Sequence, residues 1–305
     1  MNGSNIALGV AFGASAGAMW GLVFLAPELV SDFSPLSLTV GRCIGFGGLS
    51  ILFLIRRWHS IRRTFRRDDL VEVAKLAFVG NILYYVLLAT AVQLGGIAVT
   101  SLIIGFLPVA VTIVGSRERQ AVPLRKLSLS LALCAGGVLL IGWRALIAPA
   151  AGSTWESVSG LLCAIGALAS WTWYAVRNSR WLIRVPHLLV SDWNILSGIM
   201  TGGLALLLLP VAVHIDTAPH DSHALLRLTL VSLGIAFCAS IIGNACWNRM
   251  SRLLPLTLLG QMILFETLFA LIYGLIWEAR LPHLSEGLAF GMVACSVISC
   301  LAAHR

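Results

Sequence analysis

The chain has 305 residues, of which 58% are hydrophobic and 11% are charged, and its formal net charge is +8. Soluble domains carry about 25% charged residues, so this composition excludes a soluble globular protein. Apolar runs of about 20 residues, the length that crosses the hydrocarbon core of a bilayer, recur along the whole chain. The composition therefore predicts an all-α integral membrane protein that works in contact with the lipid bilayer.

Ten transmembrane helices are expected in chain order, and the stretches between them are too short for a soluble domain. The chain begins "MNGSN", without the basic region of a secretory signal, so the first span is expected to be retained. The ten expected spans cover residues 6–26, 35–55, 75–93, 97–115, 127–147, 159–180, 188–211, 227–249, 255–277 and 286–303.

The placement of the basic residues predicts the orientation. With a cytoplasmic N-terminus, seventeen Lys and Arg residues fall in inner loops and three in outer loops, which agrees with the positive-inside rule. Both termini are therefore expected in the cytoplasm. In the densest basic run, "RRWHSIRRTFRRDD", Trp58, Ile61 and Phe65 recur at helical spacing. This pattern favours a short interfacial helix on anionic lipid over a nucleic-acid site.

No cofactor or metal is expected. The seven Cys residues lie in apolar spans without a C-x-x-C pair, and buried Cys usually packs as a small hydrophobic residue. The outer loop "HIDTAPHDSH" contains His and Asp side chains of the kind that bind metals. A flexible polar loop is the simpler interpretation of this stretch.

The second half of the chain resembles the first. A shift of 151 residues aligns Trp20 with Trp171 and Pro35 with Pro186. The expected domains are a first five-helix repeat at residues 1–150 and a second at residues 151–305. Because five is odd, the two copies would cross the membrane in opposite directions. An inverted repeat of this kind predicts a central cavity and transport by alternating access.

Two phrases, "FLPVAVTIVGSRER" (106–119) and "LFETLFALIYGLIWEARL" (264–281), together with the ten spans and the repeat, resemble EamA-type members of the drug/metabolite transporter (DMT) superfamily. The tryptophan-bearing first and sixth helices are most similar to those of the YddG-type aromatic amino-acid exporters. The resemblance implies a multi-pass protein of the bacterial inner (cytoplasmic) membrane that exports small metabolites. Thr267 stands where family members commonly have Pro, so the details of that helix are not carried over.

Trp20 and Trp171 are the first candidates for the walls of a substrate cavity. Each lies deep within its span, and Trp20 is about 6 Å beyond the midplane at ~1.5 Å of rise per residue. A stripe of small residues runs beside Trp20 and permits close helix contact; it contains Gly9, Gly13, Gly17 and Gly21. We predict that both indoles project into the cavity, the alternative being that they fill ordinary space between helices.

Two chemically similar phrases, "GNILYY" (80–85) and "GNACWN" (243–248), supply further candidates. In each phrase an Asn shares a helix face with residues three and four positions later, which would offer a substrate both hydrogen bonds and aromatic faces. Hydrogen bonding between helices is the alternative role. The candidates are Asn81, Tyr84, Tyr85, Asn244, Trp247 and Asn248.

Polar and charged residues within the spans complete the candidate site. Glu266, with Gln261 just over one turn before it, is an ionisable residue at mid-membrane depth and therefore indicates function. It could bind a substrate ammonium, carry a proton or serve as a protonated structural carboxyl. Arg42 could bind a substrate carboxylate or snorkel to the outer interface. Pro108 predicts a kink and a possible hinge in the fourth span.

The leading hypothesis is a transporter that exports aromatic or neutral amino acids. Aromatic walls suit the side chain, and polar groups would satisfy the zwitterionic backbone outside water. The alternatives are an exporter of nucleotide precursors or of cationic drugs held by cation–π contacts, and a membrane-embedded receptor or enzyme. The sequence contains no H-E-x-x-H motif and no P-loop, and no catalytic residue is expected. A monomer is the expected functional unit, and a dimer is left open.

Overall fold

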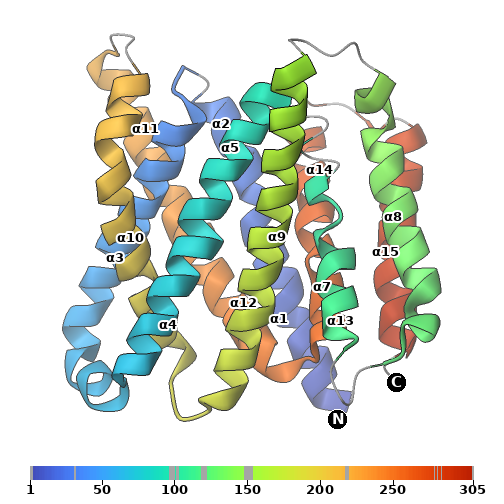
Figure 1. Cartoon of the computed structure of the whole chain (residues 1–305), viewed down its shortest axis with the longest axis horizontal. Helices are drawn as coiled ribbons and strands as arrows, with labels where there is room; N and C mark the ends of the chain where they lie inside the picture. Colours follow the sequence, from blue (N-terminus) through green and yellow to red (C-terminus); the bar gives the residue numbers. More distant parts are fainter. Residues whose placement is uncertain are drawn as a thin grey trace.

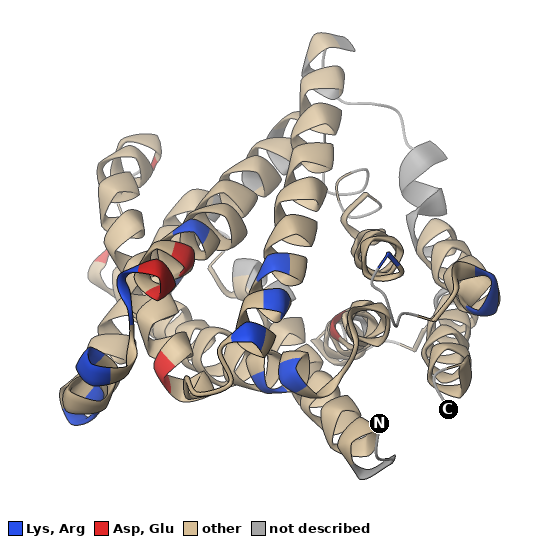
Figure 2. Ribbon diagram, turned by 60° about the horizontal axis from the view of Figure 1, so that its bottom comes forward, with Lys and Arg blue, Asp and Glu red and all other residues tan. Residues whose placement is uncertain are grey.

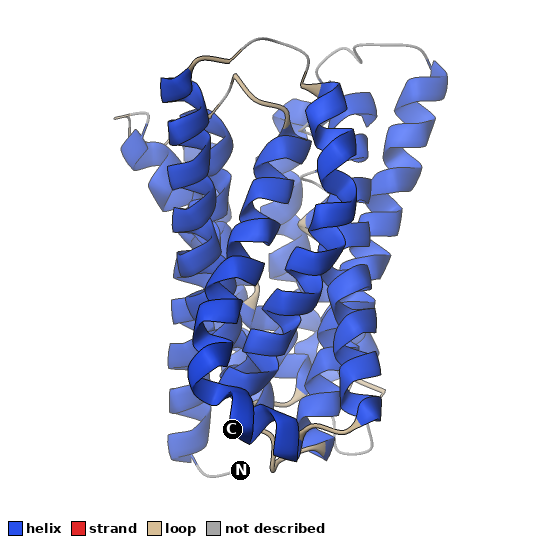
Figure 3. Ribbon diagram, turned by 90° about the vertical axis from the view of Figure 1, so that its left-hand side faces the viewer, coloured by secondary structure: helices blue, strands red, loops and turns tan. Residues whose placement is uncertain are grey.

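Helices form along the apolar runs, and the computed structural model describes them over most of the chain. The described residues are 3–30, 32–95, 100, 103–117, 122–147, 154–216, 220–277, 279, 281–282 and 284–303. Within these ranges all regular secondary structure is helical (Figure 3), which confirms the predicted all-α class.

The helices run roughly parallel to one another and form a bundle (Figure 1). At one edge α8 packs against α15, and at the opposite edge α3 packs against α10. In chain order the described elements are α1 (Gly3–Gly21), η1 (Leu22–Phe24), α2 (Ala26–Leu29), α3 (Pro35–Thr64), α4 (Arg67–Ala77), η2 (Phe78–Leu83), α5 (Tyr84–Gly95), α7 (Leu107–Gly115), α8 (Leu124–Ile147), α9 (Thr154–Arg184), α10 (Val190–Ile215), α11 (Ser222–Ile235), η3 (Ala236–Gly243), α12 (Asn244–Leu253), α13 (Leu256–Met262), α14 (Leu264–Trp277) and α15 (Leu284–Ala303).

Six helices in the described part of the chain are long and apolar enough to cross a membrane. A shorter apolar helix covers Gly287–Ala303. The count of ten spans therefore stays a prediction, and the expected fourth span, 97–115, lies partly outside the described residues. The six long helices cover Leu36–Thr64, Arg67–Leu88, Val158–Arg184, Val190–Ile215, Ser222–Leu253 and Leu256–Trp277.

The prediction of a separate interfacial helix in the basic run is wrong. Helix α3 begins at its N-cap, where the Ser34 hydroxyl accepts a hydrogen bond from the Ser37 amide, and continues through the basic run to Thr64. Ile61 is buried in the protein core, whereas Trp58 is about half exposed. Trp58 and Ile61 belong to the last turns of this long helix, which packs on α10, and Phe65 is its C-cap residue.

Two pairs of helices approach closely through glycine. A Cβ atom on Gly17 of α1 would lie 2.5 Å from the Cβ of Phe265 and 2.8 Å from the amide nitrogen of Glu266, both on α14. At the α3–α10 contact, a Cβ on Gly202 would lie 2.7 Å from the Cα of Gly47. Gly13 and Gly21 continue the α1 contact, against Met262 and against Phe269 and Ala270.

Several helices depart from regular α geometry. Segments η2 and η3 are π-helical, and such segments occur frequently at functional sites. Residues 105–106 form a turn immediately before α7, and Ile263 separates α13 from α14. Pro108 lies in the first turn of α7, where its missing N–H costs no helical hydrogen bond. The interruption predicted near Pro108 falls at residues 105–106, directly before α7, and the role of Pro108 as a hinge stays a prediction.

Helix α1 begins and α15 ends at the same end of the bundle (Figure 1). Figure 2 brings this end forward and shows Lys and Arg gathered there on several helices. The last turns of α3, α9 and α12 contribute Arg62, Arg63, Arg184 and Arg252. We call this end of the bundle the basic end.

Gly17→Ala is expected to lower the free energy of unfolding by about 1–3 kcal/mol, as overpacking of a close contact does. The added methyl meets the backbone of α14, which no rotamer change can move. A matched control is Gly48→Ala in α3, because nothing lies within 4 Å of a Cβ at that position. The control should be neutral or stabilising in denaturation titrations of the detergent-solubilised protein, and equal losses in both variants would contradict the packing argument.

Candidate functional site

Three tryptophans from different helices meet inside the bundle. The ring centroids of Trp20 (α1) and Trp171 (α9) are 6.2 Å apart with the rings edge to face. Trp247 (α12) lies 5.2 Å from Trp20 and 5.5 Å from Trp171. The structure thus brings together the two tryptophans singled out by the repeat, and it places the third candidate beside both of them. We call these three residues the tryptophan cluster.

The indole N–H groups of the cluster differ in their hydrogen bonding. Trp20 Nε1 donates to the backbone carbonyl of Ala239 in η3, at 3.1 Å. Trp247 is 1% exposed, and its Nε1 is buried without a hydrogen-bond partner among the described residues. A buried indole N–H normally finds an acceptor, so Trp247 holds an unused donor beside the other two rings.

Each π-helical segment fits a glycine against an aromatic ring on a helix of the other half of the chain. A Cβ on Gly243 would lie 2.8 Å from Trp20 Nε1, and a Cβ on Gly80 would overlap the ring of Tyr174 in α9. The tight contacts fix both rings relative to the helices beside them. Tyr174 also lies 6.0 Å from Trp171, between ring centroids.

A charged group adjoins these aromatic rings. The Arg42 side chain is only 8% exposed, and its guanidinium carbon lies 4.1 Å from the ring centroid of Tyr85. This burial contradicts the alternative in which Arg42 snorkels to the outer interface. The rings of Tyr84 and Tyr85 are 5.0 Å apart and meet edge to face.

Glu266 supplies the opposite charge. It lies half-buried in the first turn of α14, where α14 packs closely on α1 at Gly17, one turn before Trp20. Helix α5, which carries Tyr85, packs against α9, which carries Trp171 and Tyr174, and this contact connects Arg42 to the tryptophan cluster. The interior site therefore combines a cation, an anion and a row of aromatic rings.

Other candidates bond to neighbouring helices in this structure. Asn248 accepts a hydrogen bond from Asn178 Nδ2 at 2.8 Å, and Asn178 Oδ1 accepts one from Trp193 Nε1 at 3.0 Å. Gln261 is fully buried and accepts a hydrogen bond from the Ser296 hydroxyl at 2.9 Å. For Asn248 the geometry is that of the alternative, hydrogen bonding between helices, and Gln261 is bonded to α15 in the same way.

The two remaining asparagines are Asn81, which is also bonded to a neighbouring helix, and Asn244. Asn81 Nδ2 donates to the Thr201 hydroxyl at 2.9 Å, which ties η2 to α10. Asn244 is half-buried at the start of α12, directly after the π-helical segment. Sequence reasoning missed Tyr174 and Gly80 as members of the site. The spacing of three residues between Trp171 and Tyr174, which places both on one helix face, was the available signal for Tyr174.

Residues 13–17 read G-A-S-A-G, a match to the G-x-S-x-G pattern of serine hydrolases. In those enzymes the serine occupies a sharp strand-to-helix turn. Here Ser15 lies inside the continuous helix α1 and the flanking glycines contact other helices. The match therefore reflects helix packing, and the geometry of a nucleophile elbow is missing at this position.

Comparisons with known proteins agree with this fold. Residues 7–143 match the sequence profile of the EamA-like transporter family. The chain is 30% identical over 303 residues to the inner membrane protein YtfF of Escherichia coli (strain K12), and this alignment covers 95% of this chain and 94% of YtfF. It is 28% identical over 285 residues to the uncharacterized transporter YdeK of Bacillus subtilis (strain 168), and this alignment covers 90% of this chain and 89% of YdeK.

A crystal structure of another protein has the same fold, with a TM-score of 0.75 at 20% identity over 97% of this chain and 98% of that one. The apolar helices and the interior charged and aromatic site define a helical membrane protein that handles small molecules. The chain belongs to the EamA-like transporter family, within the DMT superfamily. The predicted transporter class is thereby confirmed.

Proposed function

We propose that this protein exports amino acids with aromatic or large apolar side chains from the cytoplasm by alternating access. The proposal rests on one observation, the burial of Arg42 against the ring of Tyr85 inside a bundle that also encloses the tryptophan cluster. Charged groups inside a membrane protein are costly and by default mark substrate or ion pathways.

The chemistry of the site matches a zwitterion with an apolar side chain. A guanidinium binds a carboxylate through two parallel hydrogen bonds, so Arg42 would hold the substrate carboxylate. Glu266 would hold the ammonium, and the indole faces of Trp20 and Trp171 would contact the side chain. The unused N–H of Trp247 is a further donor for the substrate. These partners would replace the hydrogen bonds that a zwitterion loses on leaving water.

Equal spacing of irregular segments supports two inverted five-helix repeats, at residues 1–150 and 151–305. The π-helical segments begin at residues 78 and 236, which are 236 − 78 = 158 residues apart. The helix breaks at residues 105 and 263 are also 263 − 105 = 158 residues apart. Paired irregular helices in the two halves are typical of transporters that bind substrate near the midplane.

The basic end supports an orientation with both termini in the cytoplasm, because cytoplasmic loops carry an excess of Lys and Arg. The name of the Escherichia coli relative supports a location in the bacterial inner membrane. In this orientation α3 begins on the outer side and ends on the cytoplasmic side.

The test uses purified protein in liposomes preloaded separately with labelled Phe, Trp, Leu or a cationic dye. Efflux is followed with and without a pH gradient. We expect Phe, Trp and Leu to leave protein-containing liposomes at least tenfold faster than empty ones, and the dye to be retained. Flux of the dye alone would assign the protein to drug export, and no flux of any compound would contradict the proposed substrate class.

A further inference from the structure

A pocket separate from the interior site opens at the basic end. Its volume is about 350 Å³, and it lies between α3, α10 and the η3–α12 helix. Its walls are mainly apolar and include Phe53, Ile195, Ile241 and Ala245. Phe53 is about two-fifths exposed, so the pocket reaches the surface of the bundle, and no residue of the tryptophan cluster lines it.

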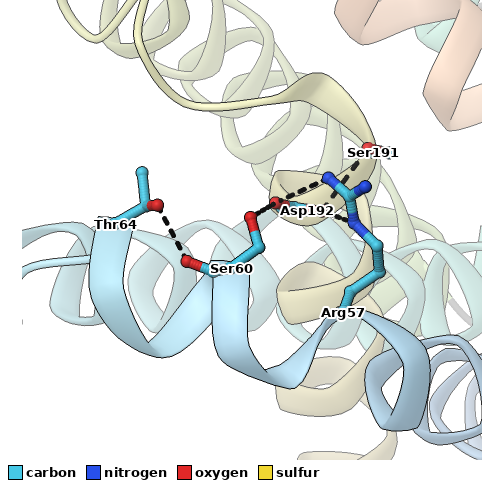
Figure 4. Close-up of polar contacts among 5 residues, drawn as sticks. All are labelled: Arg57, Ser60, Thr64, Ser191 and Asp192. Carbon is cyan, nitrogen blue, oxygen red and sulfur yellow. Dashed lines mark hydrogen bonds and ion pairs between the residues drawn. The ribbon is translucent and has the colours of Figure 1, made fainter.

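The charges at the pocket rim are only partly neutralised. Arg57 forms a bidentate pair with Asp192, with nitrogen–oxygen distances of 2.9 and 3.2 Å, and Ser60 adds a contact to the same carboxylate (Figure 4). Arg56 also lines the pocket. It forms no ion pair within the part of the chain that the structure describes. The rim therefore offers one exposed cation whose counter-charge is not supplied by a described residue.

The wall of the pocket also contains an unsatisfied hydrogen-bond acceptor. Asn194 is 4% exposed, and its Nδ2 donates to the backbone carbonyls of Ser240 and Ile241. Its Oδ1 is buried without a donor among the described residues. A buried acceptor left unpaired costs about 1–3 kcal/mol. A ligand that donates a hydrogen bond to Asn194 would recover this cost.

We propose that the pocket binds an anionic phospholipid with a hydroxylated headgroup, such as phosphatidylglycerol. The phosphate lies at Arg56, a headgroup hydroxyl donates to Asn194 Oδ1, and an acyl chain covers Phe53 and Ile241. Basic pockets between membrane helices on the cytoplasmic side bind anionic headgroups, and the apolar walls distinguish a lipid from a soluble anion. The site is independent of the proposed amino-acid transport.

The test measures lipid binding to the delipidated full-length protein by native mass spectrometry in detergent. Phosphatidylglycerol, phosphatidylethanolamine and phosphatidylcholine with identical acyl chains are titrated separately. Arg56→Gln removes the free cation, and Arg62→Gln is the matched control, since Arg62 has the same charge on the same helix and does not line the pocket. Ala245→Phe fills the pocket, and a melting curve of each variant verifies its fold.

We expect phosphatidylglycerol to bind most tightly of the three lipids. Arg56→Gln should weaken the affinity for phosphatidylglycerol at least fivefold, and Arg62→Gln should change it less than twofold. Folded Ala245→Phe should lose binding to a similar extent. Equal weakening by Arg56→Gln and Arg62→Gln would show general attraction to the basic end and overturn the proposal. Phosphatidylcholine binding as tight as phosphatidylglycerol, or displacement of the lipid by excess glycerol phosphate, would overturn it as well.

Discussion

Arg57→Ala is expected to lower the free energy of unfolding by about 3 kcal/mol, because it leaves a buried carboxylate without its counter-charge. The side chain of Asp192 is 2% exposed, whereas that of Arg57 is 38% exposed. The loss of unfolding free energy is therefore determined by the burial of Asp192, whose carboxylate cannot reach water when Arg57 is removed. The Ser60 hydroxyl, 3.4 Å from Asp192, keeps the loss near the lower end of the range for broken buried pairs.

The matched control is Arg227→Ala, which breaks the Arg227–Asp32 pair. Its side chains are 52% and 36% exposed, and an exposed pair contributes at most about 1 kcal/mol. Denaturant titrations of both variants in detergent measure the difference. The double variant Arg57→Ala/Asp192→Asn should recover part of the loss, since it removes the unpaired charge. Equal effects of Arg57→Ala and Arg227→Ala would show that burial of Asp192 does not determine the stability of the pair.

Arg42→Gln is expected to reduce Phe transport at low substrate concentration by tenfold to one-hundredfold. A hydrogen bond to a charged group contributes about 1.5–3 kcal/mol, and every 1.4 kcal/mol corresponds to a factor of about ten. Arg42→Lys should retain part of the activity, because Lys keeps the charge but lacks the planar fork that binds a carboxylate. The loss is expected in the apparent affinity more than in the maximal rate.

The measurement is initial uptake into proteoliposomes over a range of Phe concentrations. Arg63→Gln is the control, because it removes the same charge from the exposed last turn of α3. A melting curve separates loss of binding from loss of fold. Transport by folded Arg42→Gln at the wild-type affinity would contradict the assignment of the carboxylate to Arg42.

The sequence was informative where one physical effect dominates. Apolar runs predicted the helices, and the small residues around Gly17 predicted a close approach to another helix. Both patterns are local in the sequence, and their interpretation does not depend on which distant helix packs against them. The repeat likewise singled out Trp20 and Trp171, whose ring centroids lie 6.2 Å apart in the fold. It did not indicate that Trp247 packs against both rings.

The sequence was less informative where a distant partner decides the role. An Arg one turn inside a span fits both an interior site and a snorkelling side chain, and the rotation of α3, set by its packing against α10, decides between them. Gln261 and Glu266 are both polar residues of one span, yet Gln261 is bonded to Ser296 on α15. The break at residues 105–106 lies directly before Pro108, whereas the break at Ile263 has no proline beside it, so proline indicated only one of the two interruptions.

The central claim is that Arg42 and Glu266 together recognise a zwitterion with an aromatic side chain. The most direct test is competition against labelled Phe in proteoliposomes by unlabelled Phe, phenylalanine amide and 3-phenylpropionate. The wild-type protein should be inhibited strongly by Phe and at least tenfold more weakly by the amide and by the acid. Glu266→Gln should reduce the preference for Phe over 3-phenylpropionate, which lacks the ammonium group. Arg42→Gln should reduce the preference for Phe over phenylalanine amide, which lacks the carboxylate. Equal inhibition by all three compounds in the wild-type protein would contradict the claim.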